Sequence, residues 1–219
     1  METLTLRDKA NAVSGFVMKK INPLQRRLLG VGGGVPAARA SLAKLRRLGA
    51  TDGSEWMLVG DQLFEGWPED KLGQPIKGNK PTREFLAAQA ALRFYGLHQR
   101  SQKKPMAING REAEHGKYNG SFGWACRRID PDREAPNGVQ RHLASIENAV
   151  DFDGMLYQIQ GIIPRLKNVD IPLDYYVFAS DLYLLQFDVT RDGVLARWAK
   201  DYYLYHSASN DAEAQTAAD

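Results

Sequence analysis

The side chains with the clearest chemical potential are the Lys and Arg residues of the first half of the chain. Residues 19–50 contain eight basic side chains and no acidic one. Residues 1–128 carry 22 Lys or Arg against 11 Asp or Glu, whereas residues 129–219 carry 7 against 15. This division predicts that the first half binds a polyanion and that the second half presents an acidic surface to solvent or to protein.

The spacing of four basic residues places them on an expected helix over residues 36–48. Arg39 and Arg46 are seven residues apart and therefore share one face of that helix, while Lys44 and Arg47 lie on a flanking stripe. Seven residues span about 10 Å along a helix, a distance that can bridge phosphates one or two steps apart on a strand. Because no Glu is present to pair with these cations within the helix, we interpret them as nucleic-acid contacts.

A second set of basic residues surrounds a Gly-rich loop and the helices that follow it. Its members are Arg111, Lys117, Arg127, Arg128, Arg141, Arg165 and Lys167. If the fold brings these segments side by side, they extend one positive groove. No base-reading side chains are evident, so the groove would hold nucleic-acid backbones whatever their sequence.

Catalytic and metal-binding patterns are missing from the sequence. The four histidines have no spacing typical of metal ligands, and we interpret them as surface or capping residues: His98, His115, His142 and His206. Cys126 lies within an amphipathic segment and is expected to be a buried small apolar residue. The sequence therefore predicts no catalytic residue, no metal ligand and no cofactor.

Three aspartates near the expected helix starts have simpler explanations than catalysis. Asp170 and Asp174 suit capping and the helix dipole, and Asp181 is expected on an exposed face. They nevertheless supply the carboxylates for one alternative, discussed below.

Apolar residues recur at helical spacing throughout, and no segment alternates with period two. We expect helices over residues 6–21 (ended by Asn22 and Pro23), 36–48, 54–67, from 79 or 81 to 100, and 121–129. The expected later helices cover residues 139–149, 155–167 with Asp153 as cap, a segment started by Asp170 and Pro172, and a last segment capped by Asp188 or Thr190. Pro164 lies inside the expected helix over residues 155–167 and should kink it. Residues 30–34 read as a flexible glycine linker, and residues 68–80 and 101–119 as exposed loops.

The fold class that follows is all-α with two helical bundles, the C-terminal one a compact four-helix unit. The expected divisions are a basic helical domain over 1–128, a helical bundle over 129–206 and a disordered acidic tail over 207–219. The single cysteine suits a reducing compartment, and neither a membrane-spanning run nor a signal peptide is visible. We therefore expect a cytoplasmic protein.

Several strings of the second half resemble the CasB family, the small subunit of Cascade, which is the type I-E CRISPR interference complex. They are SFGWACRRI, VQRHLASIENAVDFDGMLYQIQGIIPRLK, IPLDYYVFASDLYLLQ and VLARWAKDYY. The first half is similar more loosely, through ARASLAKLRRLG and TREFLAAQAALRFYGLHQRSQ. The resemblance covers about residues 36–206 and rests mainly on core and cap positions, so it identifies the fold better than the contacts.

The resemblance implies a non-catalytic protein of two helical bundles that pairs head-to-tail along the belly of the complex. Its implied partners are the other Cascade proteins, guide RNA, target DNA and the displaced strand, held through basic surfaces that stabilise the R-loop. The positions that match basic positions of the family are Arg39, Lys44, Arg46, Arg47, Arg127, Arg128, Arg141, Arg165 and Lys167. Trp124 and His142 depart from the family pattern, because many members carry Arg at both places.

Two alternatives remain open from the sequence. A stand-alone helical DNA- or RNA-binding protein would use the same basic patches without protein partners. A metal-dependent nuclease would need acidic ligands such as Asp174 and Asp181, although no paired carboxylates at metal spacing lie near the basic residues.

Overall fold

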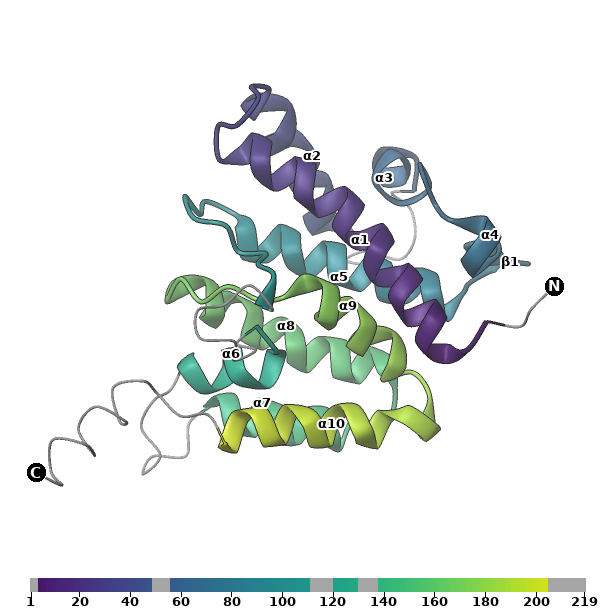
Figure 1. The fold of residues 1–219 in the computed structure, drawn as a ribbon, viewed down its shortest axis with the longest axis vertical. Coiled ribbons are helices and arrows are strands. Elements are labelled where there is room, and N and C mark those ends of the chain that lie inside the picture. The colour runs from purple at the N-terminus through teal and green to yellow at the C-terminus, as the bar shows by residue number, and fades with distance from the viewer. Residues whose placement is uncertain (1–3, 49–55, 111–119, 130–137, 205–219) are drawn as a thin grey trace, which may run out of the picture.

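The computed structural model describes residues 4–48, 56–110, 120–129 and 138–204, and these residues form ten helices and one two-stranded sheet (Figure 1). The all-α prediction is confirmed. The expected tail over 207–219, Arg111, Lys117 and residues 130–137 lie outside the described residues. Within the described ranges, no helix is long and apolar enough to cross a membrane.

The ten helices of the described residues each correspond to one segment of the chain. In the first half they are α1 (Leu6–Leu28), α2 (Val35–Arg47), α3 (Trp56–Leu63), α4 (Glu69–Leu72), α5 (Arg83–Gln99) and α6 (Phe122–Ile129). In the second half they are α7 (Gly138–Glu147), α8 (Phe152–Asn168), α9 (Tyr175–Leu184) and α10 (Asp188–Tyr203). The antiparallel strands β1 (Ile76–Lys77) and β2 (Lys80–Pro81) lie between α4 and α5.

Helix α1 is longer than the sequence predicts, because Asn22 and Pro23 do not end it. The helix continues through Pro23 to Leu28. A proline inside a helix removes one backbone hydrogen bond, but Ile21 and Leu24 on either side are both buried. Tertiary packing therefore outweighs the local cost of the proline.

The starts of α8 and α9 differ from the prediction by a few residues. Asp151, rather than Asp153, caps α8, because its Oδ1 atom accepts a hydrogen bond from the Gly154 amide at 2.8 Å. Asp174, rather than Asp170, caps α9 by accepting from the amides of Tyr176 and Val177. In both cases the aspartate that caps is the one whose own backbone is still extended.

The last helix, α10, starts without the predicted side-chain cap. Phe187 occupies the N-cap position, and Asp188 is already the first helical residue. The Thr190 hydroxyl instead donates to the Leu184 carbonyl oxygen at 2.7 Å, which ties α10 back to the end of α9.

The described residues from α3 to the start of α5 contain more secondary structure than the sequence predicts. They include α4 and the small sheet where a loop over 68–80 is predicted. The apolar spacing of residues 54–67 predicts that Leu58, Leu63 and Phe64 face the core. Leu63 of α3 is buried, but Leu58 is 55% exposed, and Phe64, which directly follows α3, is also exposed. The period of the helix turns Leu58 to solvent once Val59 and Leu63 face the core.

The helices form layers in which α9 joins the two halves. Helix α9 packs against α1 and α5, α5 packs against α2 and α8, and the pairs α7–α8 and α6–α10 complete the lower part of Figure 1. One hydrophobic core runs through both halves, from Val17 of α1 to Trp198 of α10. The boundary near residue 128 and the four-helix C-terminal unit stay predictions.

His98 lies at the end of α5 in the core, not on the surface or at a cap as the sequence suggests. Its Nε2 atom is 3.0 Å from the Ile171 carbonyl oxygen, and its Nδ1 atom is 3.1 Å from the Tyr175 hydroxyl. A carbonyl oxygen can only accept, so Nε2 carries the proton and the Tyr175 hydroxyl donates to Nδ1. Burial lowers the pKa of His98 to about 4.

We expect this histidine to make the fold sensitive to acid. The unfolded chain takes up a proton at His98 near pH 6.5, whereas the folded chain does so only near pH 4, so stability is lost as the pH falls between these values. The loss reaches about 3 kcal/mol at the lower end. Urea unfolding between pH 7 and pH 4.5 measures it, and His98→Asn should show a shallower dependence on pH than the wild type. An NMR titration in which the His98 ring protonated near pH 6.5 in the folded chain would contradict the assignment.

Candidate nucleic-acid interface

A basic groove lies where α2 crosses the C-terminal end of α5. Its volume is about 600 Å³, and its cationic lining consists of Arg39, Arg46, Arg100 and Lys103. None of the described residues that line it is Asp or Glu. The prediction that Arg39 and Arg46 share one helix face is confirmed, because both line this groove.

The close crossing of α2 and α5 places these cations together. Leu42 and Leu45 of α2 are buried against the core, which turns the opposite side of the helix outward. At Gly96 of α5, an added Cβ would lie 3.0 Å from the Arg46 backbone nitrogen. The absence of a side chain at Gly96 therefore allows Arg46 to come down beside the end of α5, where Arg100 follows.

Arg100 and Lys103 are the members of the groove that the sequence analysis misses. They belong to the turn after α5, next to Ser101, whose φ angle of 63° places its backbone in the left-handed region. The signal that could have found them is the basic run at the end of α5, but only the crossing with α2 shows which surface it joins. Lys104, the next residue, pairs with Asp170 at 3.0 Å.

The other two predicted residues of α2 lie outside the groove lining. Lys44 forms an ion pair with Asp61 near the end of α3 at 3.0 Å, and both side chains are substantially exposed. Such an exposed pair contributes little to stability, but it partly compensates the charge of Lys44. Arg47 is exposed at the end of the helix.

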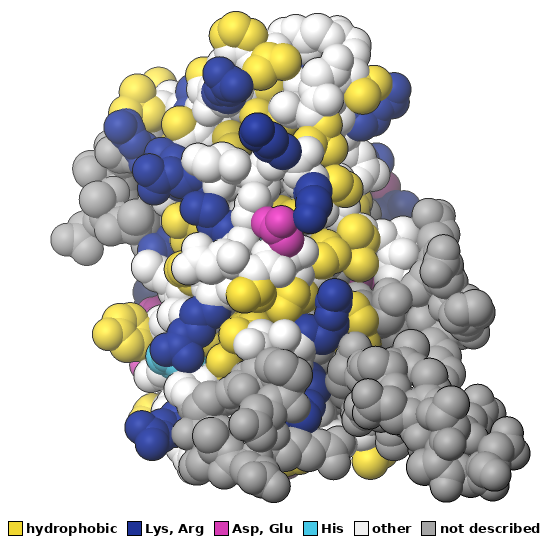
Figure 2. Space-filling model, turned by 90° about the vertical axis from the view of Figure 1, so that its left-hand side faces the viewer, with side chains coloured by type: hydrophobic (Ala, Val, Ile, Leu, Met, Phe, Trp, Pro, Cys, Tyr) yellow, Lys and Arg dark blue, Asp and Glu magenta, His cyan; other side chains and the backbone are white. Residues whose placement is uncertain are grey.

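The basic face continues from the groove to α8 and α7. The side chain of Gln102, which lines the groove, donates to the Lys167 carbonyl oxygen near the end of α8. The exposed Arg165 guanidinium covers Gly138 at the start of α7, where an added Cβ would lie 2.6 Å from it. Arg141 is exposed on α7. Figure 2 shows Lys and Arg side chains spread along this face and few acidic ones.

On α6 the structure separates two residues that the sequence treats alike. Arg127 is buried, and its guanidinium lies 5.9 Å from the centre of the Tyr202 ring, so the prediction of a surface contact for this side chain does not match its position. Arg128 is exposed and lies 4.6 Å above the Trp124 ring. Trp124 thus has a defined protein contact in the stacking of Arg128.

His142, the other departure from the family pattern, is a packing residue. Its Nδ1 atom is 2.9 Å from the Gln158 side-chain oxygen, and its ring covers Gly161 of α8. The ring therefore helps to join α7 to α8.

The carboxylates of the nuclease alternative have structural roles. Asp174 is buried and accepts hydrogen bonds from the amides of Gly110, Tyr176 and Val177. Asp181 is also buried, not exposed as predicted, and it accepts from Arg197 and from the Trp198 indole. Burial raises the pKa of Asp181 to about 7, although the attraction of Arg197 opposes the shift.

The remaining candidates for chemistry are the cysteine and a possible group of metal ligands. Cys126 is fully buried, as predicted, and burial raises the pKa of its thiol well above the usual range. In the part of the chain that the structure describes, no group of three or more His, Cys, Asp or Glu residues is arranged to hold a metal ion.

Comparison with known proteins identifies the family. The family described as CRISPR-associated protein Cse2 matches residues 41–203, which is most of the chain. The chain belongs to the Cse2 family. The resemblance to CasB, another name for this family, is therefore confirmed, and the matched range includes every basic helix described above except the first residues of α2.

A solved relative shows that the Cse2 fold extends beyond the matched range. The crystal structure of CasB from Thermobifida fusca superposes with a TM-score of 0.67 at 22% sequence identity, and it covers 92% of this chain and 99% of that chain. At this identity the similarity shows the fold alone. No curated protein matches the sequence.

Proposed function

We propose that this Cse2 protein is a non-catalytic small subunit of Cascade whose basic face holds nucleic-acid backbones and thereby stabilises the R-loop. The observation that carries the proposal is the groove at the crossing of α2 and α5, with four cations and no carboxylate among its described lining residues. Membership of a CRISPR-associated family supports a nucleic acid as the polyanion.

The composition of the groove favours contact with phosphates over reading of bases. Arg side chains bind phosphate oxygens with two parallel hydrogen bonds, and each bound phosphate releases counterions. The groove offers Arg39, Arg46 and Arg100 for such contacts, with Lys103 as a fourth charge. The binding should therefore depend on salt and little on sequence.

The remaining basic residues extend the same role along the face. We assign backbone contacts to Arg47, Arg128, Arg141, Arg165 and Lys167, and to Arg111 and Lys117, which lie outside the described residues. Lys44 contributes with its charge partly compensated by Asp61, and Arg127 supports α6 from within.

The partners in this proposal follow from the family. They are the other Cascade proteins, the guide RNA, the target DNA with its displaced strand, and a second copy of this chain in a head-to-tail pair, all in the cytoplasm. A stand-alone nucleic-acid-binding protein would differ by purifying without the other subunits and without a guide RNA.

A salt titration tests the basic face directly. We expect the affinity of the free chain for a labelled DNA or RNA strand to fall log-linearly and steeply with salt concentration, because each phosphate contact contributes about one unit of slope. Strands of unrelated sequence should bind with nearly equal affinity. Fluorescence anisotropy from low to physiological salt measures both quantities, and an affinity that stayed constant over that range would exclude binding through the basic face.

A further inference from the structure

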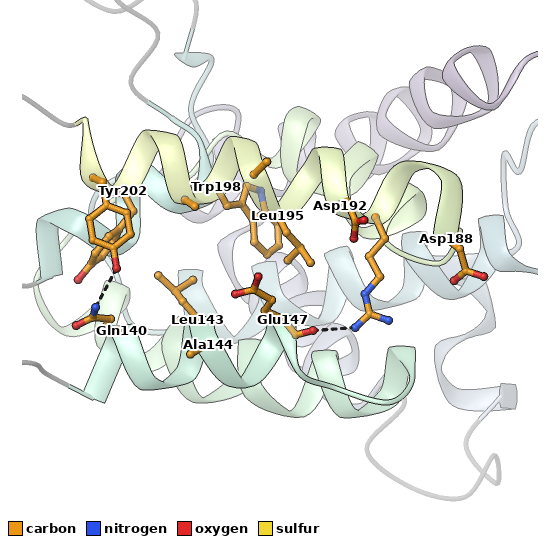
Figure 3. Close-up of a pocket in the computed structure, with 13 residues that line it drawn as sticks. Gln140, Leu143, Ala144, Glu147, Asp188, Asp192, Leu195, Trp198 and Tyr202 are labelled. Atoms are coloured by element: carbon orange, nitrogen blue, oxygen red, sulfur yellow. Dashed lines mark hydrogen bonds between the residues drawn. The ribbon is translucent and has the colours of Figure 1, made fainter.

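A second groove, of opposite character, lies between α7 and α10 (Figure 3). Its volume is about 570 Å³. The residues that form its floor are apolar and include several alanines: Leu143, Ala144, Leu195, Ala196, Trp198 and Ala199. Small side chains on both walls leave room between the two helices, and the buried Trp198 fixes the floor to the core.

Side-chain hydrogen bonds hold the two walls at both ends of this α7–α10 groove. At one end, the Arg191 guanidinium donates to the backbone oxygens of Glu147 and Ala149, at 3.2 and 2.6 Å. At the other end, the Gln140 amide donates to the Tyr203 hydroxyl at 2.9 Å. The groove is therefore formed before any partner arrives, which lowers the entropic cost of binding.

The rim of the α7–α10 groove is acidic. Glu147, Asp188 and Asp192 all line it and are exposed, and none of them forms an ion pair with a described residue. Among the described lining residues the one cation is Arg191, whose guanidinium donates to backbone carbonyl oxygens at the end of α7. The rim thus repels a nucleic acid and attracts a cationic surface.

Exposed apolar side chains extend the floor beyond the Arg191 end. Val150 follows Ala149 and is 97% exposed, and Val189 precedes Arg191 by two residues and is 84% exposed. Large apolar side chains left this open beside an apolar groove are typical of an interaction surface. Val189 directly follows the rim residue Asp188 at the start of α10.

We propose that the α7–α10 groove docks an amphipathic helix of another protein, one whose apolar stripe is flanked by Lys or Arg. From Gln140 to Glu147 the groove spans about two helical turns, which suits apolar side chains at positions i, i+4 and i+7 of the guest. Its apolar side chains would cover the alanine-rich floor, and its cations would meet Glu147, Asp188 and Asp192. The proposal is independent of the nucleic-acid-binding role proposed for the basic face.

A designed peptide tests this docking surface on the full chain. The probe is a four-turn synthetic helix with a Leu stripe and Lys on both flanks, compared with the same peptide carrying Glu in place of Lys. We expect the Lys peptide to shift the NMR resonances of α7 and α10, and Asp188→Lys with Asp192→Lys to weaken its binding at least tenfold. The same double variant should bind the Glu peptide at least tenfold better than the wild type does.

A charge-matched control separates the groove from general electrostatics. Glu69→Lys with Asp70→Lys makes the same change in net charge on the exposed first turn of α4, and it should leave the affinity for either peptide unchanged. Equal losses in the two double variants would overturn the proposal, as would resonance shifts outside α7 and α10. Sedimentation gives a further test that could overturn the proposal. If the chain self-associated, and only the Asp188 and Asp192 changes made it monomeric, the occupant of the groove would be a second copy of the chain.

Discussion

Gly123→Ala is expected to destabilise the fold by about 3 kcal/mol or more, the largest loss we expect from a single methyl group. At Gly123 the first turn of α6 rests directly on the backbone of α10. An added Cβ would overlap the Trp198 carbonyl oxygen and lie 2.7 Å from its carbon. Backbone atoms cannot move aside as a flexible side chain can, so α6 and α10 would have to separate. Urea unfolding of the purified chain measures the loss.

Gly193→Ala is the matched control for that change. Gly193 also lies inside a helix, α10, but an added Cβ there would meet nothing within 4 Å. We expect it to stabilise the chain by roughly 0.5–1 kcal/mol, because alanine loses less backbone entropy in a helix than glycine does. If the two variants had similar stabilities, the close packing of α6 on the backbone of α10 would be contradicted.

The contact at Gly123 illustrates which parts of the fold the sequence can predict. The inward faces of individual helices follow from spacing along one segment. The spacing of Leu42, Leu45 and Leu48 predicts that they face the core, and all three are buried. The crossing of two helices depends on residues far apart in the chain, and nothing near Gly123 in the sequence points to Trp198. Helix ends were predicted less accurately for a related reason, since burial of Ile21 and Leu24 carries α1 past Pro23.

The same distinction applies to the candidate site. Arg39 and Arg46 could be placed together because both belong to one helix and their spacing is local. Arg100 and Lys103 could not, because they reach the groove only through the crossing of α2 and α5 at Gly96. Arg127 and Arg128 are neighbours in the sequence, yet one turns inward to Tyr202 and the other outward over Trp124. A basic pair in a sequence does not show which member faces solvent.

The loss of three groove cations is expected to have the largest effect on nucleic-acid binding. Arg39→Ala, Arg46→Ala and Arg100→Ala together remove the arginines of the α2–α5 groove and leave Leu42 and Leu45 in the core. Each lost phosphate contact lowers the salt slope by about 0.7 for a single strand and about 0.9 for a duplex, so the slope should fall by roughly 2 to 3 units. The free energy of binding should become less favourable by a few kcal/mol at low salt. Fluorescence anisotropy across a salt series measures both changes.

The matched control removes the same charge from a different surface. Lys71→Ala, Lys77→Ala and Lys80→Ala remove three exposed cations from α4 and the small sheet, away from the groove lining. This variant should keep nearly the full salt slope, and circular dichroism should show that both triple variants remain helical. In the assembled complex, the exchange of DNA–DNA pairing for guide RNA–DNA pairing is nearly balanced in free energy. A loss of a few kcal/mol of binding free energy in the groove variant should therefore visibly reduce the fraction of opened target DNA. Guide RNA should remain loaded by the other subunits. If both triple variants lowered the slope equally, binding would follow net charge alone, and the α2–α5 groove would have no special role in it.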